Sequence, residues 1–128
     1  MNLYSIACRI ASEDDVESYI KESSQGDGYK IITDYGYIEY RPVNDEGDFI
    51  NEIWWVQSNK SGGGTRLVNL MMKENPSHAI AWGVTSQLGK KLMESWHRKN
   101  PNILCIKGPL EGQFDPYGQS DDPVDQQD

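Results

Sequence analysis

The sequence predicts an α/β (α+β) domain with a mixed, mainly antiparallel central sheet and helices on both of its faces. Between residues 29 and 57, three strand-like runs follow one another with only tight turns between them, and such strands pair antiparallel. From residue 61 to residue 106, segments with helical spacing of apolar residues alternate with short apolar runs, a pattern typical of strand–helix–strand units with parallel strands. The chain of 128 residues is long enough for one independent core.

The N-terminal part is expected to supply one strand and one helix. Residues 3–11 alternate loosely between apolar and polar side chains, which indicates a strand. Ser12 is followed by three acidic residues, and this is a helix-start signal because carboxylates stabilise the positive end of a helix. We therefore expect a helix that continues through Tyr19 and Ile20 and ends at the glycine-containing segment 23–28.

The middle of the chain predicts a hairpin and a central strand. Residues 29–34 and 37–43 indicate two strands joined by a turn at Tyr35-Gly36. Residues 49–57 form the third strand and contain a continuous apolar run, which is expected of a strand covered on both faces.

The remaining elements follow from helix-start signals, helix-end signals and apolar spacing. Proline after asparagine ends each of two helices, and two short apolar runs indicate further strands. The expected elements are a helix from the glycine cluster to Asn75, a strand at 79–85, a helix at 86–100 and a strand at 103–106. Residues 1–112 are taken as the domain, and residues 113–128 as an acidic, disordered tail.

Composition excludes several classes of function. The net charge of −8 and the lack of a basic stripe argue against a nucleic-acid partner, and they fit either a cationic substrate such as an amine or plain solubility. No signal peptide and no long apolar run is apparent, so we expect a cytoplasmic protein without a membrane partner. Cys8 and Cys105 lie in apolar runs, and His78 and His97 are expected at the surface, so no metal site is predicted.

The segment most informative about chemistry is a glycine turn before a helix. A helix N-terminus presents unpaired N–H groups and a partial positive charge, and glycines let an anion approach the backbone closely. Gly62 to Thr65 therefore predict a phosphate site, with a plain turn as the alternative. A P-loop does not fit because Lys60-Ser61 precedes the glycines, and a Rossmann turn does not fit because Leu67 replaces its third glycine.

Residues Glu52 to Leu67, with Asn59-Lys60-Ser61-Gly62-Gly63-Gly64, resemble motif A of the GNAT N-acetyltransferases. That motif is Gln/Arg-x-x-Gly-x-Gly/Ala at the end of the fourth strand. The expected order of elements over about residues 3–110 is also similar to that of the family. The resemblance implies a GNAT-like acyl-CoA N-acyltransferase fold that binds acetyl-CoA (coenzyme A).

In that family the glycine turn holds the coenzyme A pyrophosphate, and the fourth strand separates from the fifth and pairs with the pantetheine arm. The resemblance thus implies cofactor contacts from the end of the strand and from the turn. The residues concerned are Trp55, Val56, Gln57, Asn59, Lys60, Ser61, Gly62, Gly63, Gly64 and Thr65.

The resemblance further implies transfer of the acetyl group to a primary amine by direct attack on the thioester. The acceptor is an amine-bearing small molecule, or a protein lysine or N-terminus. Glu52 is similar in placement to the glutamate that acts as base in histone-acetylating members, with a surface residue as the alternative reading. Ser86, Ser95 or a water is the candidate proton donor to the thiolate, because Met93 stands where many members have tyrosine.

A second hypothesis follows from the departures from the family pattern. Met93, Asn59 in place of Gln/Arg and a shorter loop also fit a catalytically inactive GNAT-like scaffold, a protein-binding or phage-associated accessory protein. A nucleic-acid mimic is disfavoured, because lysines interrupt the acidic residues. A monomer and a homodimer both remain open.

Overall fold

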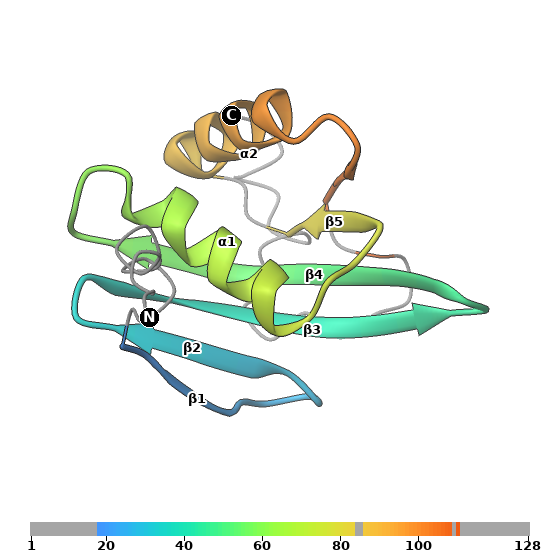
Figure 1. Ribbon diagram of the computed structural model, residues 1–128, viewed down its shortest axis with the longest axis horizontal. Helices are drawn as coiled ribbons and strands as arrows, with labels where there is room; N and C mark the ends of the chain where they lie inside the picture. Colours follow the sequence, from blue (N-terminus) through green and yellow to red (C-terminus); the bar gives the residue numbers. More distant parts are fainter. Residues whose placement is uncertain (1–17, 84–85, 109, 111–128) are drawn as a thin grey trace, which may run out of the picture.

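The computed structural model describes residues 18–83, 86–108 and 110, and within these it contains one mixed sheet and two helices (Figure 1). The sheet has six strands in the same order in space as in the chain. The α+β class with a mixed sheet is thus confirmed. The elements are β1 (Ile20–Ser23), β2 (Tyr29–Thr33), β3 (Gly36–Asp45), β4 (Asp48–Ser58), α1 (Gly63–Glu74), β5 (Ala79–Trp82), α2 (Gln87–Lys99) and β6 (Leu104–Lys107).

Strands β1 to β4 are antiparallel, and β4, β5 and β6 are parallel to one another. The predicted hairpin around Tyr35-Gly36 is confirmed, and so are the two helices that end at Asn75 and Asn100. The β3–β4 hairpin is the longest pair in the sheet, and its tip extends beyond the neighbouring strands (Figure 1). The strand expected at 79–85 is shorter, because its pairing ends at Trp82.

The expected helix through Tyr19 and Ile20 is wrong where the structure describes it. Residues Ile20–Ser23 are instead strand β1, which pairs with β2 from Ile20↔Ile32 to Ser23↔Tyr29. Gly26 and Asp27 both have positive φ, so the segment we interpreted as a helix end is the tight turn of a hairpin. The predicted strand at 3–11, the helix start at Ser12 and the acidic tail at 113–128 lie outside the described residues.

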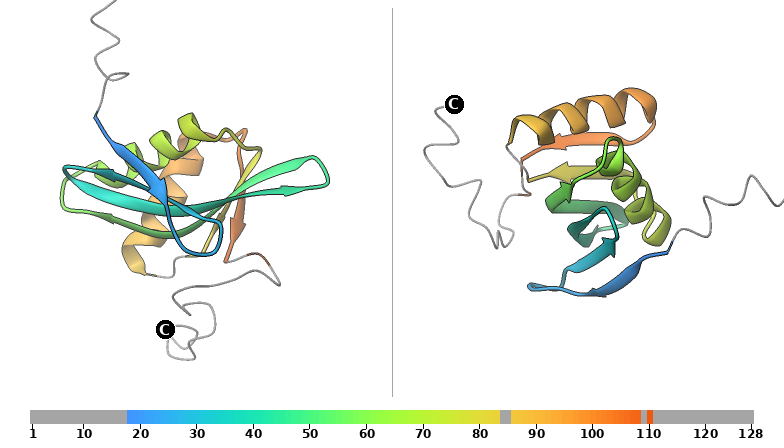
Figure 2. Two further views of the ribbon diagram at one scale, coloured as in Figure 1. Left: turned by 90° about the horizontal axis from the view of Figure 1, so that it is seen from below. Right: turned by 90° about the vertical axis from the view of Figure 1, so that its left-hand side faces the viewer.

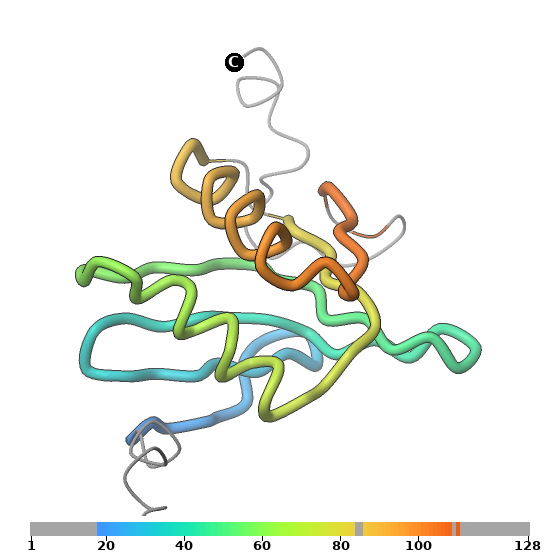
Figure 3. The backbone as a smooth tube through the Cα atoms, turned by 45° about the horizontal axis from the view of Figure 1, so that its top comes forward, coloured from blue at the N-terminus to red at the C-terminus, as the bar shows by residue number. Residues whose placement is uncertain are grey.

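The expectation of helices on both faces is also wrong for α1 and α2, which lie on the same face of the sheet (Figures 2 and 3). The two crossovers, β4–α1–β5 and β5–α2–β6, step in the same direction across the sheet. Because parallel crossovers are right-handed, both helices must then cover one face. A hydrogen bond from Trp96 Nε1 to Asn69 Oδ1, 2.9 Å, joins the two helices directly.

The core lies between this face and the helices. Its largest fully buried side chains include Trp82, Tyr40 and Met71, and Trp96 is nearly as buried. Within the described residues no helix has the length and apolar character needed to span a bilayer.

Candidate ligand site at the end of strand β4

The pairing of β4 with β5 ends well before the C-terminal end of β4. The two strands pair over four residues only, and the last pair joins Ile53 to Trp82. The N–H of Gly83 still donates to the carbonyl of Ile53, 3.0 Å away, after which β4 continues to Ser58 paired with β3 alone. The β3–β4 register shifts at this point and leaves Trp54 as an extra residue, so a bulge coincides with the separation.

A cavity of about 360 Å³ occupies the space opened beside the end of β4. Such a volume is within the usual range for small-molecule sites. Its walls come from the end of β4, from the glycine turn with the first turn of α1, and from the start of α2. The described lining residues are Val56, Gln57, Ser58, Lys60, Gly62, Gly64, Thr65, Ser86, Leu88, Gly89 and Leu92.

The N-terminus of α1 forms one end of this cavity. Gly62 is the N-cap with φ 78°, a left-handed conformation that glycine adopts without strain. No side chain caps the helix and no acidic residue lies in its first turn, so the backbone N–H groups and the helix dipole leave this end electropositive. Lys60 adds a full positive charge beside it. This end of the cavity is therefore suited to an anion.

The other two glycines are accounted for by packing. A Cβ on Gly63 would lie 1.9 Å from Ser58 Oγ, and one on Gly64 would lie 3.1 Å from a Leu92 methyl. Gly63 thus lets the turn close onto the end of β4, and Gly64 lets α1 approach α2. Of the three glycines in this turn, only Gly62 has the positive φ that favours glycine.

The structure brings together most of the residues predicted to contact a cofactor. Val56, Gln57, Lys60, Gly62, Gly64 and Thr65 line the cavity, and Ser86 joins them from α2. Trp55, Asn59, Ser61 and Gly63 are not among its lining residues. The indole of Trp55 donates to Gln57 Oε1, Asn59 and Ser61 are exposed, and Gly63 is buried in the turn.

The cavity has an apolar wall from α2 that no signal in the sequence had indicated. Leu88 and Leu92 lie in line with Trp96 along α2, yet Trp96 is buried whereas Leu88 is 78% exposed. Their i, i+4 spacing does not distinguish packing against the sheet from lining a cavity beside it. Leu88, Gly89 and Leu92 together give the cavity its apolar side.

Glu52, the candidate base, is not in this cavity. Its side chain is fully buried on the face of the sheet opposite α1, since the neighbouring Asn51 faces α1 and donates to the carbonyl of Asn75. The Glu52 carboxylate lies 3.5 Å from Arg41 Nε and accepts hydrogen bonds from Trp54 Nε1 and from the N–H of Leu110. These contacts use both of its oxygens. The surface reading of Glu52 is wrong because the side chain is fully buried, and its role as a base stays a prediction.

Ser86 caps a helix and Met93 packs in the core. Ser86 is the N-cap of α2, and its Oγ accepts a hydrogen bond from the N–H of Gly89 at 3.0 Å. Its hydroxyl proton is left for another acceptor, so a donor role toward a ligand in the cavity is compatible with capping. Met93 is buried in the core between α2 and its neighbours.

No family model matches this sequence, and no curated protein matches it either. Among the described residues, no three His, Cys, Asp or Glu side chains gather where they would hold a metal ion.

Proposed function

We propose that this chain binds acetyl-CoA in the cavity beside β4 and transfers the acetyl group to a primary amine, as an N-acetyltransferase with a GNAT-like fold. The observation that carries the proposal is the early end of β4–β5 pairing at Ile53↔Trp82. It opens a cavity that extends from the part of β4 beyond its described pairing with β5 to the uncapped N-terminus of α1.

The lining residues match the two chemical parts of the ligand. The pyrophosphate is placed at Gly62 to Thr65, where backbone N–H groups and Lys60 favour negative charge. The pantetheine arm is an amide chain with apolar segments. The β4 backbone beyond Ile53 has no pairing with β5 and is therefore able to pair with those amides, while Leu88 and Leu92 cover the methylene groups.

The reaction joins the amine nitrogen to the thioester carbonyl carbon and breaks the carbon–sulfur bond, with one proton lost by the amine and one gained by the thiolate. No described lining residue carries a carboxylate. In this proposal water takes the amine proton, and Ser86 is the hydroxyl available to the leaving sulfur. The rate is then expected to rise with pH until the acceptor amine is deprotonated.

A second candidate function is a coenzyme A-binding scaffold without turnover. The pairing of Glu52 with Arg41 favours it, because this carboxylate is fully buried, forms an ion pair and already accepts hydrogen bonds from two donors. The burial of Met93, at the position where many family members carry tyrosine, points the same way.

The binding proposal is tested by thermal unfolding with and without millimolar acetyl-CoA. At about 100 times the dissociation constant, the ligand should stabilise the fold by roughly 2.7 kcal/mol, a shift of several degrees for a domain of this size. Thr65→Glu should remove the shift, since it places a negative charge at the helix N-terminus without opposing the helix dipole. Asn102→Asp, an exposed residue outside the cavity lining, is the matched control for added charge.

Either of two results contradicts binding in this cavity: no shift for the unmodified protein, or an undiminished shift for Thr65→Glu. Turnover is then measured as release of free thiol with a panel of small amines and lysine peptides. Ligand-induced stabilisation without thiol release on any acceptor would favour the scaffold over the transferase.

A further inference from the structure

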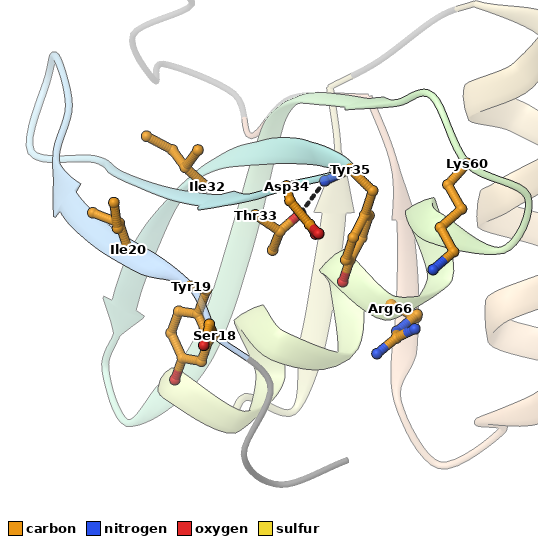
Figure 4. A pocket seen from close by; sticks show the side chains of 9 residues that line it. All are labelled: Ser18, Tyr19, Ile20, Ile32, Thr33, Asp34, Tyr35, Lys60 and Arg66. Carbon is orange, nitrogen blue, oxygen red and sulfur yellow. Dashed lines mark hydrogen bonds between the residues drawn. The ribbon is translucent and has the colours of Figure 1, made fainter. Parts of the chain in front are cut away.

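A second cavity, of about 650 Å³, lies on the other side of the first turn of α1 (Figure 4). Its walls come from β1, from the turn between β2 and β3, and from the start of α1. The charged and aromatic side chains that line it are Tyr19, Asp34, Tyr35, Lys60 and Arg66. Two cations and one carboxylate give it a net positive charge in a chain whose overall charge is −8.

The two cations are held against one aromatic ring. Lys60 Nζ lies 5.7 Å from the centroid of Tyr35, and the guanidinium carbon of Arg66 lies 5.4 Å from it. Tyr35 is only 5% exposed, and its N–H donates to Thr33 Oγ1 (dashed in Figure 4). The Tyr35 carbonyl accepts from the N–H of Asn59, which ties this turn to the segment before Lys60. The ring that both cations lie against is therefore fixed by the fold.

Lys60 lines both cavities. A ligand whose pyrophosphate lies at the N-terminus of α1 thus has a second group of cations within reach, past Lys60 and toward Arg66. Coenzyme A carries a second anionic group, the phosphate on the 3′-hydroxyl of its ribose, separate from the pyrophosphate. A phosphate monoester has a charge of about −1.5 to −2 at neutral pH and accepts strong hydrogen bonds from guanidinium and ammonium groups.

We infer that Lys60 and Arg66 bind the 3′-phosphate of coenzyme A in this second cavity, with Asp34 as the opposing charge. The inference rests on the proposed function, since it requires the pyrophosphate to lie at Gly62 to Thr65. It makes the protein selective for coenzyme A over dephospho-coenzyme A. It also gives the two basic residues different roles. Arg66 lines the second cavity and not the first, so it contacts the 3′-phosphate alone, whereas Lys60 lines both cavities.

Calorimetric titration with coenzyme A and with dephospho-coenzyme A tests the inference on the full chain. The unmodified protein should bind coenzyme A about tenfold more tightly, or more, as expected for charge-assisted contacts to a phosphate. Arg66→Gln should reduce the ratio severalfold, with Lys60 still present, while the affinity for dephospho-coenzyme A stays unchanged. Lys73→Gln, at the far end of the same helix, should leave both affinities as they are.

Asp34→Asn provides an independent test at an exposed turn residue. It removes the carboxylate that opposes the phosphate and should increase the preference for coenzyme A. Equal affinity of the unmodified protein for the two ligands, or a preference that Arg66→Gln leaves intact, would overturn the inference while the proposed function stands. Binding of neither ligand would overturn the proposed function and this inference with it.

Discussion

The indole N–H of Trp82 donates a hydrogen bond to Nε2 of His97, 2.8 Å away. Nδ1 of the same imidazole lies 3.0 Å from the carbonyl oxygen of Ile103, and since a carbonyl only accepts, Nδ1 carries the proton. These two contacts fix a neutral tautomer between β5 and the segment that leads into β6. The expectation of a surface role for His97 is therefore wrong: its ring also meets Trp96 edge to face, with centroids 5.1 Å apart.

Protonation of His97 should destabilise the fold. Burial lowers the pKa of His97 below its ordinary value of about 6.5, partly offset by the hydrogen bond to Ile103. Between the folded pKa and about pH 6.5 the unfolded chain binds more protons, so the free energy of unfolding decreases as the pH falls through this window. Urea unfolding from pH 5 to 8 should show this decrease in the unmodified protein and not in His97→Gln. The His78→Gln variant, at an exposed residue, should retain it.

Loss of the Glu52 charge should be costly for stability. In Glu52→Gln, an amide NH₂ group replaces one carboxylate oxygen and points its hydrogens at a group that also donates. Arg41 loses its counter-charge at the same time. We expect a loss of roughly 3 kcal/mol in the free energy of unfolding. Glu94→Gln, exposed on α2, should change it by less than about 0.5 kcal/mol.

A double-mutant cycle separates the ion pair from the hydrogen bonds. Arg41→Met should cost less in the Glu52→Gln background than in the unmodified protein, because the charge pair is already broken. Equal costs in the two backgrounds would show that the 3.5 Å contact between Arg41 and Glu52 carries no coupling.

A side chain at Gly63 should prevent the turn from closing. In Gly63→Ala the new Cβ would lie 1.9 Å from Ser58 Oγ and 3.0 Å from the Tyr35 ring, so we expect a loss of about 1–3 kcal/mol. Ser58→Gly should recover part of this loss in the double variant, since it removes the nearest atom. An unchanged melting temperature for Gly63→Ala would contradict the close packing of the turn on β4.

A substitution at Leu88 should weaken the binding of acetyl-CoA without destabilising the fold. Its side chain is 78% exposed and lines the cavity, so Leu88→Gln should leave the melting temperature of the free protein within about 1 °C. The same change should weaken acetyl-CoA binding severalfold in titration, because apolar contact with the ligand is lost. Lys91→Gln, an exposed residue of the same helix that does not line the cavity, is the control. Unaltered affinity of the Leu88 variant would place the ligand elsewhere.

Local signals in the sequence were sufficient for most of the described elements. The turn at Tyr35-Gly36, the proline after Asn75 and the serine at position 86 each mark a boundary that the structure reproduces. The failure at Ile20 has a specific cause. Tyr19 and Ile20 satisfy helical spacing, but the pairing of Ile20 with Ile32 is a tertiary contact that overrides it.

Only part of the candidate site was predicted, because the rest of it also depends on tertiary contacts. The glycine turn is contiguous in the sequence, so its chemistry was visible, whereas the wall from Leu88 and Leu92 depends on how α2 packs against α1. Glu52 shows the same limit. The partner of its charge, Arg41, lies on the adjacent strand, and only the register of the sheet brings the two residues together.

The order of the strands has a consequence for how the molecule is made on the ribosome. Each of the six described strands adds to the edge left by the strand before it, so none of these six has to insert between two others, and most of their pairings close short loops. The antiparallel part can form while the rest of the chain is still being synthesised. The cavity beside β4 is complete only once α2 has emerged and packed, so a nascent chain that ends before residue 92 should have the strands of the site and no capacity to retain a ligand.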